Sequence, residues 1–559
     1  RYLKELVEEG KVSIDDIDRS VANILRVKFK LGLFENPYTG TPQSVKYDKA
    51  HLAAARQSAA EGTVMLKNDN ATLPLSTDIK RILVTGPMAD APHDQLGTWA
   101  FDGEKDSTVT VLDALRDIYG DKVQIIYEPG LGYSRDKSTA GIAKAVSAAR
   151  NADAVIAVVG EEAILSGEAH SLADINLLGA QGELIEALSR TGKPLVTVFI
   201  AGRPLTIAKQ VEESDAVLYS FHPGTMGGPA IADLLFGVVS PSGKLPVTFP
   251  KSVGQIPVYY SEKNTGRPAS GHETLLNDIP AEAGQTSLGC TSYYLDAGFG
   301  PLFPFGYGLS YGDFSYSDLA IDKSSYGVDD TIKATVTLSN NGKREATEVA
   351  QLYVRDMVGS VTRPVKELKG FKKVFLKAGE EKEVEIELSK RAFAFYDVDL
   401  GDWHVETDNY KILVGASSRD IRLEGSVKVE STVDAPVKDL RETMPAYYSA
   451  DVMNVPDDQF KALLGHEIPE SEIHDYPNLT FANTLEDSAC GKNGAKLCKM
   501  LRKFVGSEGM ACSIALQTPV KNFVSMSMGV FSEELGRQLL DILNDKKPMG
   551  RGILVLIGK

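Results

Sequence analysis

Residues 80–260 alternate between short apolar runs and segments with helical periodicity. The apolar runs are typical of buried strands, and the segments between them repeat apolar residues every three or four positions. Near-continuous apolar strands fit a sheet that is covered on both faces. We therefore predict a doubly wound α/β domain, with strands at 82–85, 123–127, 154–159, 195–200 and 216–220 and helices at 111–118, 142–149, 184–188 and 231–236.

From about residue 330 to 425 the hydrophobic period changes to two. Apolar and polar residues alternate from Ile332 to Leu338, and again from Val384 to Leu388. Asn340-Asn341-Gly342 is typical of a turn. Several short strands within one segment indicate a β-sandwich, which we place at 316–430.

The other segments have weaker patterns. Residues 1–40 predict one amphipathic helix with an extended exit, in which Ser13 and Asp16 approximate a capping box and Gly32 ends the helix. Residues 41–79 are expected to be a linker. Residues 240–310 are rich in Pro, Gly and Tyr and are expected to wrap around the domains rather than form a core, with the connector proper at 261–315. We expect a small helical extension at 431–559, with helices near 495–505 and 533–544.

Composition narrows the classes of function. The length of 559 residues suggests three or four domains. The formal net charge is −16 without a long Lys/Arg run, which argues against a nucleic-acid partner. No apolar window is long enough to span a membrane. No targeting segment is visible before Arg1, which leaves the compartment open, with the cytoplasm favoured over the periplasm or secretion.

The sequence gives no reason to expect a metal or a cofactor. The 4 cysteines are too few for a disulfide framework, and they lack the paired spacing of a zinc site, so free thiols are expected. Gly224, Gly227 and Gly228 precede a helix, but no Lys is placed to hold a phosphate. No G-x-S-x-G elbow stands at a strand-to-helix turn, which argues against an α/β-hydrolase.

The longest loop of the α/β domain follows Val159 and is rich in acids. Loops after the carboxyl ends of strands are where such sheets bind ligands. Several carboxyl groups in one loop suit general acid–base chemistry, although a solvated acidic surface loop is the common alternative. The candidate residues are Glu161, Glu162, Glu168, His170 and Asp174.

Motifs over nearly the whole chain resemble one known family, in the family's own order. They include Glu61-Gly62-Thr63-Val64-Met65-Leu66-Lys67-Asn68, Val84-Thr85-Gly86-Pro87, Pro241-Ser242-Gly243-Lys244-Leu245-Pro246, Phe303-Pro304-Phe305-Gly306-Tyr307-Gly308-Leu309-Ser310-Tyr311 and Arg363-Pro364-Val365-Lys366-Glu367-Leu368-Lys369-Gly370-Phe371. The chain resembles glycoside hydrolase family 3, the β-glucosidase family, in its linker, its second domain and its fibronectin-type-III-like domain. Residues 460–469 are similar to an extension of some bacterial members.

The resemblance implies a retaining mechanism with two carboxyl groups. In the family, an Asp on a barrel strand attacks the anomeric carbon and a Glu on a loop of the second domain protonates the leaving oxygen. Gly167-Glu168-Ala169-His170-Ser171 resembles that acid/base segment, so Glu168 is the expected acid/base, with Glu162 and then Glu161 as fallbacks. His170 and Trp99 are candidate sugar contacts. A plain surface role for His170 and core or interface packing for Trp99 are the competing interpretations.

The family's barrel domain, which carries the nucleophile, is expected outside this sequence. Residues 1–40, with Lys30-Leu31-Gly32-Leu33-Phe34, resemble only the last helix and exit of that barrel. We therefore expect no nucleophile in this chain and an unpartnered helix at 1–40. The implied partners are an oligosaccharide or β-glucoside substrate and either a barrel domain or a second copy of the chain.

Three hypotheses of function follow. The first is a retaining exo-β-glycosidase of β-glucosidase type, which hydrolyses terminal β-linked glucose from short oligosaccharides. The second is a non-catalytic carbohydrate-associated or assembly module. The third is a β-xylosidase-like enzyme acting on xylose or arabinose, since the barrel residues that select the sugar are not in the sequence.

Overall fold

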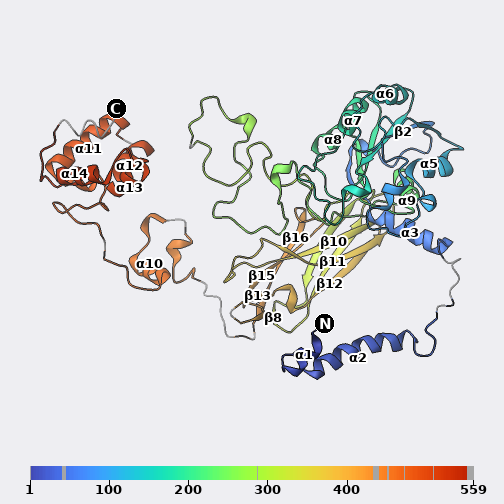
Figure 1. The fold of residues 1–559 in the computed structure, drawn as a ribbon, viewed down its shortest axis with the longest axis horizontal. Coiled ribbons are helices and arrows are strands. Elements are labelled where there is room, and N and C mark those ends of the chain that lie inside the picture. The colour runs from blue at the N-terminus through green and yellow to red at the C-terminus, as the bar shows by residue number, and fades with distance from the viewer. Residues whose placement is uncertain are drawn as a thin grey trace. The chain divides into compact units, whose positions relative to one another are not determined.

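The computed structural model describes residues 2–38, 40, 46–285, 287–398, 400–431, 433, 440–449, 452–470, 472–507 and 509–550. The chain divides into two compact units, Arg1–Lys438 and Asp439–Lys559 (Figure 1). Each unit has its own hydrophobic core. No helix within the described ranges has both the length and the apolar character needed to cross a bilayer.

A six-stranded sheet with the order β1-β6-β5-β4-β2-β3 forms the centre of the α/β domain. All neighbours are parallel except β1, which runs antiparallel to β6. The five predicted strands are confirmed to within one residue at each end. The sixth strand, β1, lies in the segment expected to be a linker. The strands are β1 (Val64–Asn68), β2 (Arg81–Thr85), β3 (Gln124–Tyr127), β4 (Ala154–Gly160), β5 (Leu195–Ile200) and β6 (Ala216–Tyr219).

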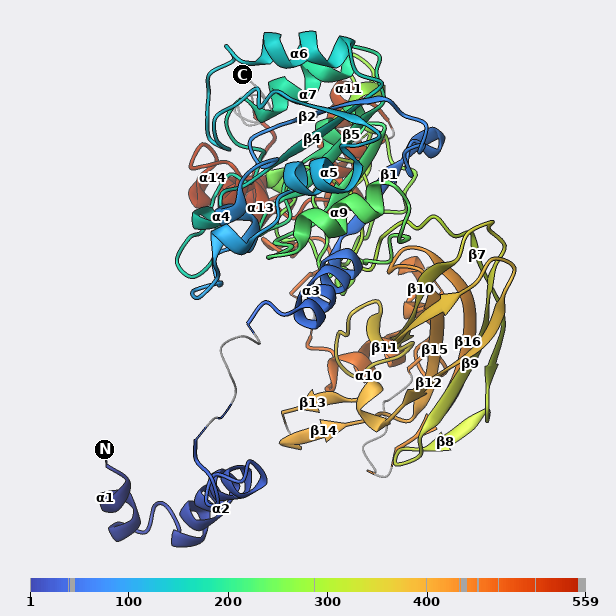
Figure 2. The same cartoon turned by 90° about the vertical axis from the view of Figure 1, so that its right-hand side faces the viewer.

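Helices cover both faces of this sheet, so the doubly wound fold is confirmed (Figure 2). Leu83 and Val155 pack with α6 and α7 on one face, whereas Ile82 and Ile156 pack with α5 and α9 on the other. This alternation explains why apolar residues fill consecutive positions of the strands, as in Ala154–Gly160. The helices are α3 (Lys49–Gly62), α4 (Pro92–Leu96), α5 (Val111–Tyr119), α6 (Ile142–Arg150), α7 (Gln181–Ser189), α8 (Ala208–Glu213) and α9 (Gly227–Leu235).

The second domain of this unit is a β-sandwich with sheets ordered β11-β10-β15-β16-β8 and β12-β9-β7. The alternating residues from Ile332 to Leu338 are buried in its core. At the predicted turn, Gly342 N donates to Asn340 Oδ1 (3.1 Å), but the chain crosses there from one sheet to the other instead of forming a hairpin. The strands are β7 (Phe314–Ile321), β8 (Ser325–Gly327), β9 (Ile332–Asn340), β10 (Ala346–Arg355), β11 (Glu367–Leu376), β12 (Glu381–Leu388), β15 (Asp408–Gly415) and β16 (Ile421–Glu430), with a separate hairpin of β13 (Phe395–Asp397) and β14 (Asp402–His404).

The Pro- and Gly-rich segment 240–310 contributes to the core, so the expectation that it only wraps is wrong. Phe249 and Phe303 are buried, and Phe249 N donates to Phe303 O (2.9 Å). The Phe249 ring lies 4.9 Å from that of Tyr219 in β6. Isolated aromatic anchors of this kind leave no periodic signal in the sequence.

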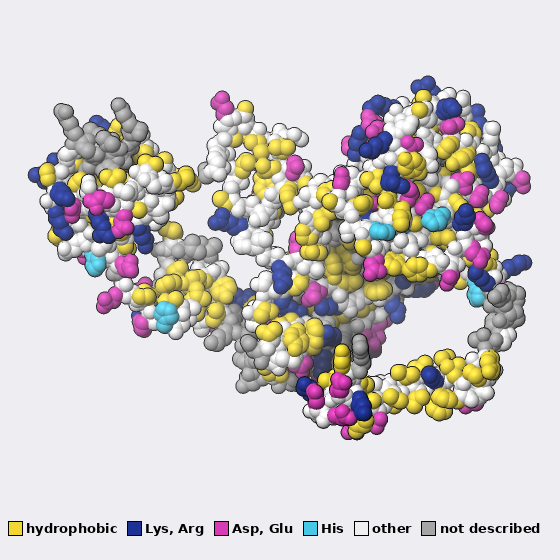
Figure 3. Space-filling model, viewed as in Figure 1, with side chains coloured by type: hydrophobic (Ala, Val, Ile, Leu, Met, Phe, Trp, Pro, Cys, Tyr) yellow, Lys and Arg dark blue, Asp and Glu magenta, His cyan; other side chains and the backbone are white. Residues whose placement is uncertain are grey.

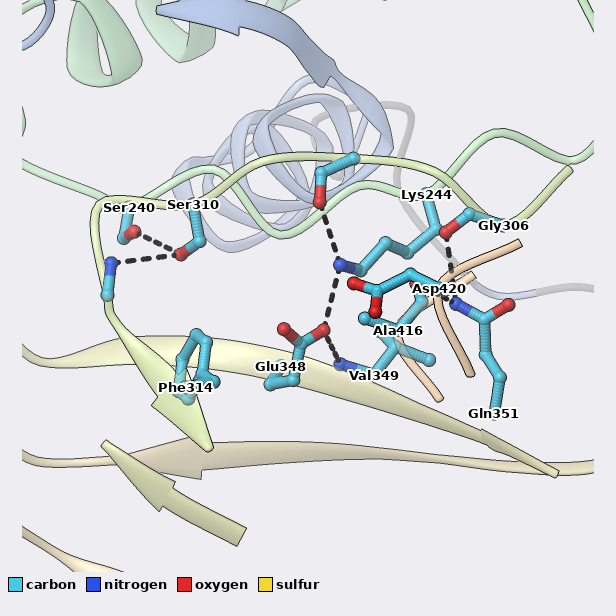
Figure 4. A network of polar contacts seen from close by, with 12 residues as sticks. Ser240, Lys244, Gly306, Ser310, Phe314, Glu348, Val349, Gln351, Ala416 and Asp420 are labelled. Carbon is cyan, nitrogen blue, oxygen red and sulfur yellow. Dashed lines mark hydrogen bonds and ion pairs between the residues drawn. The ribbon is translucent and has the colours of Figure 1, made fainter. Parts of the chain in front are cut away.

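A buried polar network joins the α/β domain to the sandwich (Figure 4). Lys244 Nζ lies 2.8 Å from Glu348 Oε1 of β10, and it also donates to Gly308 O (2.8 Å). Beside this pair, Gln351 donates to Gly306 O (3.0 Å). Both charged side chains are largely buried, at 12% and 5% exposure, so the pair binds the two domains together where water has little access.

The N-terminal segment forms two helices, α1 (Leu3–Glu8) and α2 (Ile14–Lys30), where one was expected. Gly10 adopts a φ of 70° and interrupts the helix. The predicted cap is confirmed, because Asp16 N donates to Ser13 Oγ (3.1 Å). No residue of α2 is buried, and hydrophobic side chains lie along the helix surface (Figure 3).

The smaller unit is helical, and the two helices predicted there are confirmed. It contains α10 (Asp457–Leu464), α11 (Lys492–Val505), α12 (Met510–Gln517), α13 (Val520–Met526) and α14 (Glu533–Leu543). Leu497, Leu516 and Leu540 belong to its core. The cysteines of the chain are free thiols as expected, with Cys290 and Cys490 exposed and Cys498 and Cys512 buried.

Candidate functional site

Loops that follow several strands meet at the carboxyl edge of the parallel sheet. The loop after β4 contacts α4, which follows β2, because Ala163 N donates to Asp94 Oδ1 (3.0 Å). The same loop contacts the residues after β6, because Ser166 Oγ lies 3.3 Å from His222 Nε2. This is the edge at which open α/β sheets bind ligands.

Glu162 is held in an ion pair on the stem of the β4 loop. Its carboxylate accepts hydrogen bonds from Arg135 Nη2 (2.9 Å), Arg135 Nε (3.0 Å) and Ser134 Oγ (2.6 Å). The hydrogen bond from Arg135 is the main reason that the pKa of Glu162 is lowered. A lowered pKa favours the ionised carboxylate over a proton donor.

Glu161 is buried beside Arg203, which follows β5. Its exposed fraction is 1%, and Arg203 Nε donates to its Oε2 (3.1 Å). Burial raises the pKa of Glu161, and the opposing charge of Arg203 lowers it to a smaller extent. In the described structure Glu161 Oε1 is buried without a hydrogen-bond partner. The side chain is therefore inaccessible to a substrate of sugar size.

Glu168 is exposed at the tip of the same loop. His170 N donates to Gly167 O (3.2 Å), which closes a tight turn around Glu168. Gly167 has a φ of 107°, and a Cβ at this position would lie 2.7 Å from Thr98 Cγ2. The described residues form no hydrogen bond or ion pair with the Glu168 carboxylate, so the turn presents this carboxyl group to solvent.

The two candidate sugar contacts are exposed as well. His170 is exposed, and only its backbone carbonyl and amide make the hydrogen bonds found among the described residues. Trp99 is 62% exposed, with its ring edge-to-face with Phe101 at 6.0 Å. Trp99 is therefore not a core residue of this chain. Its neighbour Thr98 contacts the glycine before Glu168, which places the loop of Trp99 next to that of Glu168.

Two further residues of this edge, Arg203 and His222, were missed by the sequence analysis. Burial lowers the pKa of His222, and its Nδ1 has no hydrogen-bond partner in the described structure. A Cβ at Gly202 would lie 2.3 Å from Ser166 Oγ and 2.6 Å from His222 Nε2. The glycine thus allows the β4 and β6 loops to approach. The signal available in the sequence was their position, since Arg203 closely follows β5 and His222 closely follows β6.

The arrangement can supply proton transfer. An exposed carboxyl group can donate a proton to a leaving oxygen and later accept one from water. Among the described residues, no group of three His, Cys, Asp or Glu side chains is arranged to hold a metal ion. Displacement at a sugar carbon also needs a nucleophile, and neither paired glutamate is free for that role.

Comparison with known families agrees with the order of the two domains. Residues 63–311 match the glycosyl hydrolase family 3 C-terminal domain, and residues 348–418 match the fibronectin type III-like domain. The α/β domain and the sandwich that follows it thus stand in the order of these two family domains. The chain belongs to glycoside hydrolase family 3.

Individual relatives point the same way. The chain is 39% identical to the periplasmic β-glucosidase of Salmonella typhimurium, over 77% of this chain and 57% of that protein. It is 38% identical to a β-xylosidase of Formosa agariphila, over 75% and 56%. The crystal structure of β-glucosidase from Listeria innocua in complex with glucose matches with a TM-score of 0.66 and 37% identity, over 77% of this chain and 56% of that one. The chain thus spans a little over half the length of these relatives.

Proposed function

We propose that this chain supplies the acid/base half of a retaining exo-β-glycosidase that hydrolyses terminal β-linked glucose from short oligosaccharides. Glu168 protonates the departing oxygen while an Asp of a barrel domain outside these residues attacks the anomeric carbon. Glu168 then takes a proton from the water that releases the sugar. The observation that carries this proposal is the exposed position of Glu168 on a turn at the carboxyl edge of the sheet.

The other two glutamates of the loop suit this role less well. Glu162 is ion-paired and its pKa is lowered, which opposes proton donation. Glu161 has a raised pKa, as a proton donor should, but it is buried and bonded to Arg203. A general acid must come within hydrogen-bond reach of the leaving oxygen, and of the three only Glu168 extends into solvent.

The similarity to a β-xylosidase supports a second candidate sugar, xylose. The choice between glucose and xylose depends on contacts with the hydroxyl groups of the terminal sugar, which the barrel domain is expected to provide. A non-catalytic carbohydrate-associated module is the alternative from a different class of function.

A complementation assay tests the proposal. The chain is mixed with a separately produced family 3 barrel domain, and the release of p-nitrophenol is measured from the β-glucoside and the β-xyloside. We expect turnover only with the barrel, because proton transfer contributes about 10²–10⁴-fold and cannot replace a nucleophile. Glu168→Ala should lose most of this rate, and azide should partly restore it by attacking the glycosyl intermediate.

Glu183→Ala is the matched control, because Glu183 is an exposed glutamate on α7 of the same domain. It should keep the rate of the unmodified chain. No turnover with either sugar in the presence of the barrel would favour the non-catalytic module. A Glu168→Ala variant with an unchanged rate would refute the role of Glu168.

A further inference from the structure

We propose that Arg203 is a positioning residue for Glu168 and that Glu161 holds Arg203 in place. This inference rests on the proposed role of Glu168. It adds a second buried layer to the site, in which an ion pair beneath the acid/base loop determines where the loop tip lies.

The guanidinium of Arg203 reaches the loop on both sides of Glu168. Arg203 Nη2 donates to Leu165 O and to His170 O, the latter at 3.1 Å. The two carbonyls lie three residues before and two residues after Glu168. One planar group therefore ties together the two arms of the turn that carries the carboxyl group, and both hydrogen bonds are charge-assisted and strong.

Arg203 is itself fixed by contacts with Glu161 and Tyr219. Its Nε donates to the buried Glu161 (3.1 Å), and its side chain is only 17% exposed. Its carbonyl accepts a hydrogen bond from the hydroxyl of the buried Tyr219 in β6. Pro204 follows directly and restricts the backbone of Arg203. The side chain of Arg203 is thus anchored at the end of β4, and its backbone is anchored to β6.

The far end of the loop is fastened to the same segment. Thr206 N donates to Ile175 O (3.0 Å), and Thr206 Oγ1 donates to Asn176 Oδ1 (2.5 Å). Residues 203–206 therefore hold both the tip and the exit of the loop. Glu168 lies between Leu165 and His170, so Arg203 restrains the backbone on both sides of this residue.

The neighbouring pair Arg135–Glu162 provides a natural comparison. It also joins a guanidinium to a carboxylate, at 2.9 Å, and its Glu162 directly follows Glu161 in the sequence. However, Arg135 is 51% exposed, and among the described residues its guanidinium forms no hydrogen bond with a carbonyl of residues 165–170. Arg135→Ala removes an ion pair from the loop without removing the bonds around Glu168.

Hydrogen exchange of the full chain tests the ordering step without any need for turnover. Arg203→Ala should speed amide exchange in peptides that cover residues 163–172 by about tenfold or more, since local opening no longer breaks two charge-assisted bonds. Arg203→Lys should fall in between, because a single ammonium cannot bind both carbonyls and also replace the separate bond from Nε to Glu161. Arg135→Ala should leave these peptides near the exchange of the unmodified chain. In Arg203→Ala the increase at 163–172 should exceed any increase in peptides from β4 and β5, which open only with the whole domain. Unchanged exchange at 163–172 in Arg203→Ala, or a uniform increase across the domain, would overturn the proposal.

A leaving-group series in the presence of the barrel domain tests the catalytic consequence. Dinitrophenyl glucoside leaves without protonation, whereas methyl glucoside needs the acid. Arg203→Ala should lower kcat/KM for the methyl glucoside about 10²-fold more than for the dinitrophenyl glucoside, because a misplaced acid costs rate only where a proton is required. Arg135→Ala should affect both substrates alike.

Equal losses on both substrates in Arg203→Ala would reduce Arg203 to a structural residue and overturn the proposal. If the unmodified chain shows no turnover with the barrel, the hydrogen-exchange measurement alone tests whether Arg203 orders the loop. A faster exchange at 163–172 then upholds the ordering of the loop by Arg203 while the proposed function fails.

Discussion

The two domains of the larger unit each contain a buried guanidinium–carboxylate pair that holds a loop, and the two pairs are satisfied to different degrees. In the sandwich, Arg363 Nη1 lies 2.9 Å from Asp356 Oδ2 and also donates to Phe393 O (2.8 Å). In the α/β domain, Arg203 binds Glu161 and two loop carbonyls. Both arginines thus connect a buried acid to the backbone of a distant segment.

The difference lies in the acids. Asp356 Oδ1 accepts a hydrogen bond from Val358 N (3.2 Å), so both of its oxygens are bonded. Glu161 Oε1 is buried and has no partner among the described residues. A fully bonded polar network rigidifies a domain, whereas a buried oxygen without a protein partner is free to bind water or another group. We therefore assign the sandwich pair mainly to stability and the α/β pair to the candidate site.

The largest expected effect is the loss of stability in Arg363→Ala. The substitution leaves Asp356 buried without its counter-ion, which costs about 3–5 kcal/mol. Urea unfolding of the full chain measures the change. Arg391→Ala, which removes an exposed arginine over Trp403 in the same domain, should cost about 1 kcal/mol or less. Similar losses in the two variants would contradict the assignment.

Arg203→Ala should have a smaller effect on stability, about 1–3 kcal/mol, because water can reach the loop carbonyls left behind and because Glu161, whose pKa is already raised, can bind a proton instead of remaining charged. The loss should grow as the pH rises. Glu161 has a raised pKa in the folded chain, and without Arg203 the pKa rises further, so ionisation of Glu161 opposes folding more strongly. Unfolding measured at several pH values checks this, and a loss that shrinks with rising pH would contradict it.

Asp356→Asn should change the pH dependence of the sandwich. Burial raises the pKa of Asp356 from 3.8 to about 6, so the folded chain binds this proton more tightly than the unfolded chain. Its contribution to stability is full below pH 3.8 and is lost as the pH rises to about 6. The Asp356→Asn variant should not show this decline of stability with rising pH. Parallel pH–stability curves for the variant and the unmodified chain would show that Asp356 does not titrate in this way.

The smallest expected effect is that of Glu168→Ala on stability. Glu168 is exposed and bonded to no described residue, so the free energy of unfolding should change by about 0.5 kcal/mol or less. Thermal unfolding checks this alongside the activity assay. A loss of about 3 kcal/mol or more, as in breaking a buried pair, would mean that Glu168 has a structural partner.

The strands of the α/β domain could be predicted because both faces of the sheet are covered. Apolar residues then fill consecutive positions, as in Ala154–Gly160. In contrast, β1 could not be predicted, since its short apolar run pairs with β6 more than 140 residues away. The burial of Phe249 and Phe303 also gave no signal, because these anchors stand alone among prolines and glycines.

The candidate site could be predicted only in part. The position of the acidic loop follows from the β4 strand, and the resemblance to the family selected Glu168 within it. The choice among the three glutamates on physical grounds needed the structure, because Glu161 and Glu162 differ in the arginines they bind. Arg203 lies 42 residues from Glu161, and no local pattern connects such a pair.

The Lys244–Glu348 contact constrains how these domains can be recombined. An ammonium group with 12% exposure needs its carboxylate, so a chimera that exchanges only the sandwich would have to keep an acid at position 348. Evolutionary shuffling would then tend to pass on the α/β domain and the sandwich as one inherited block.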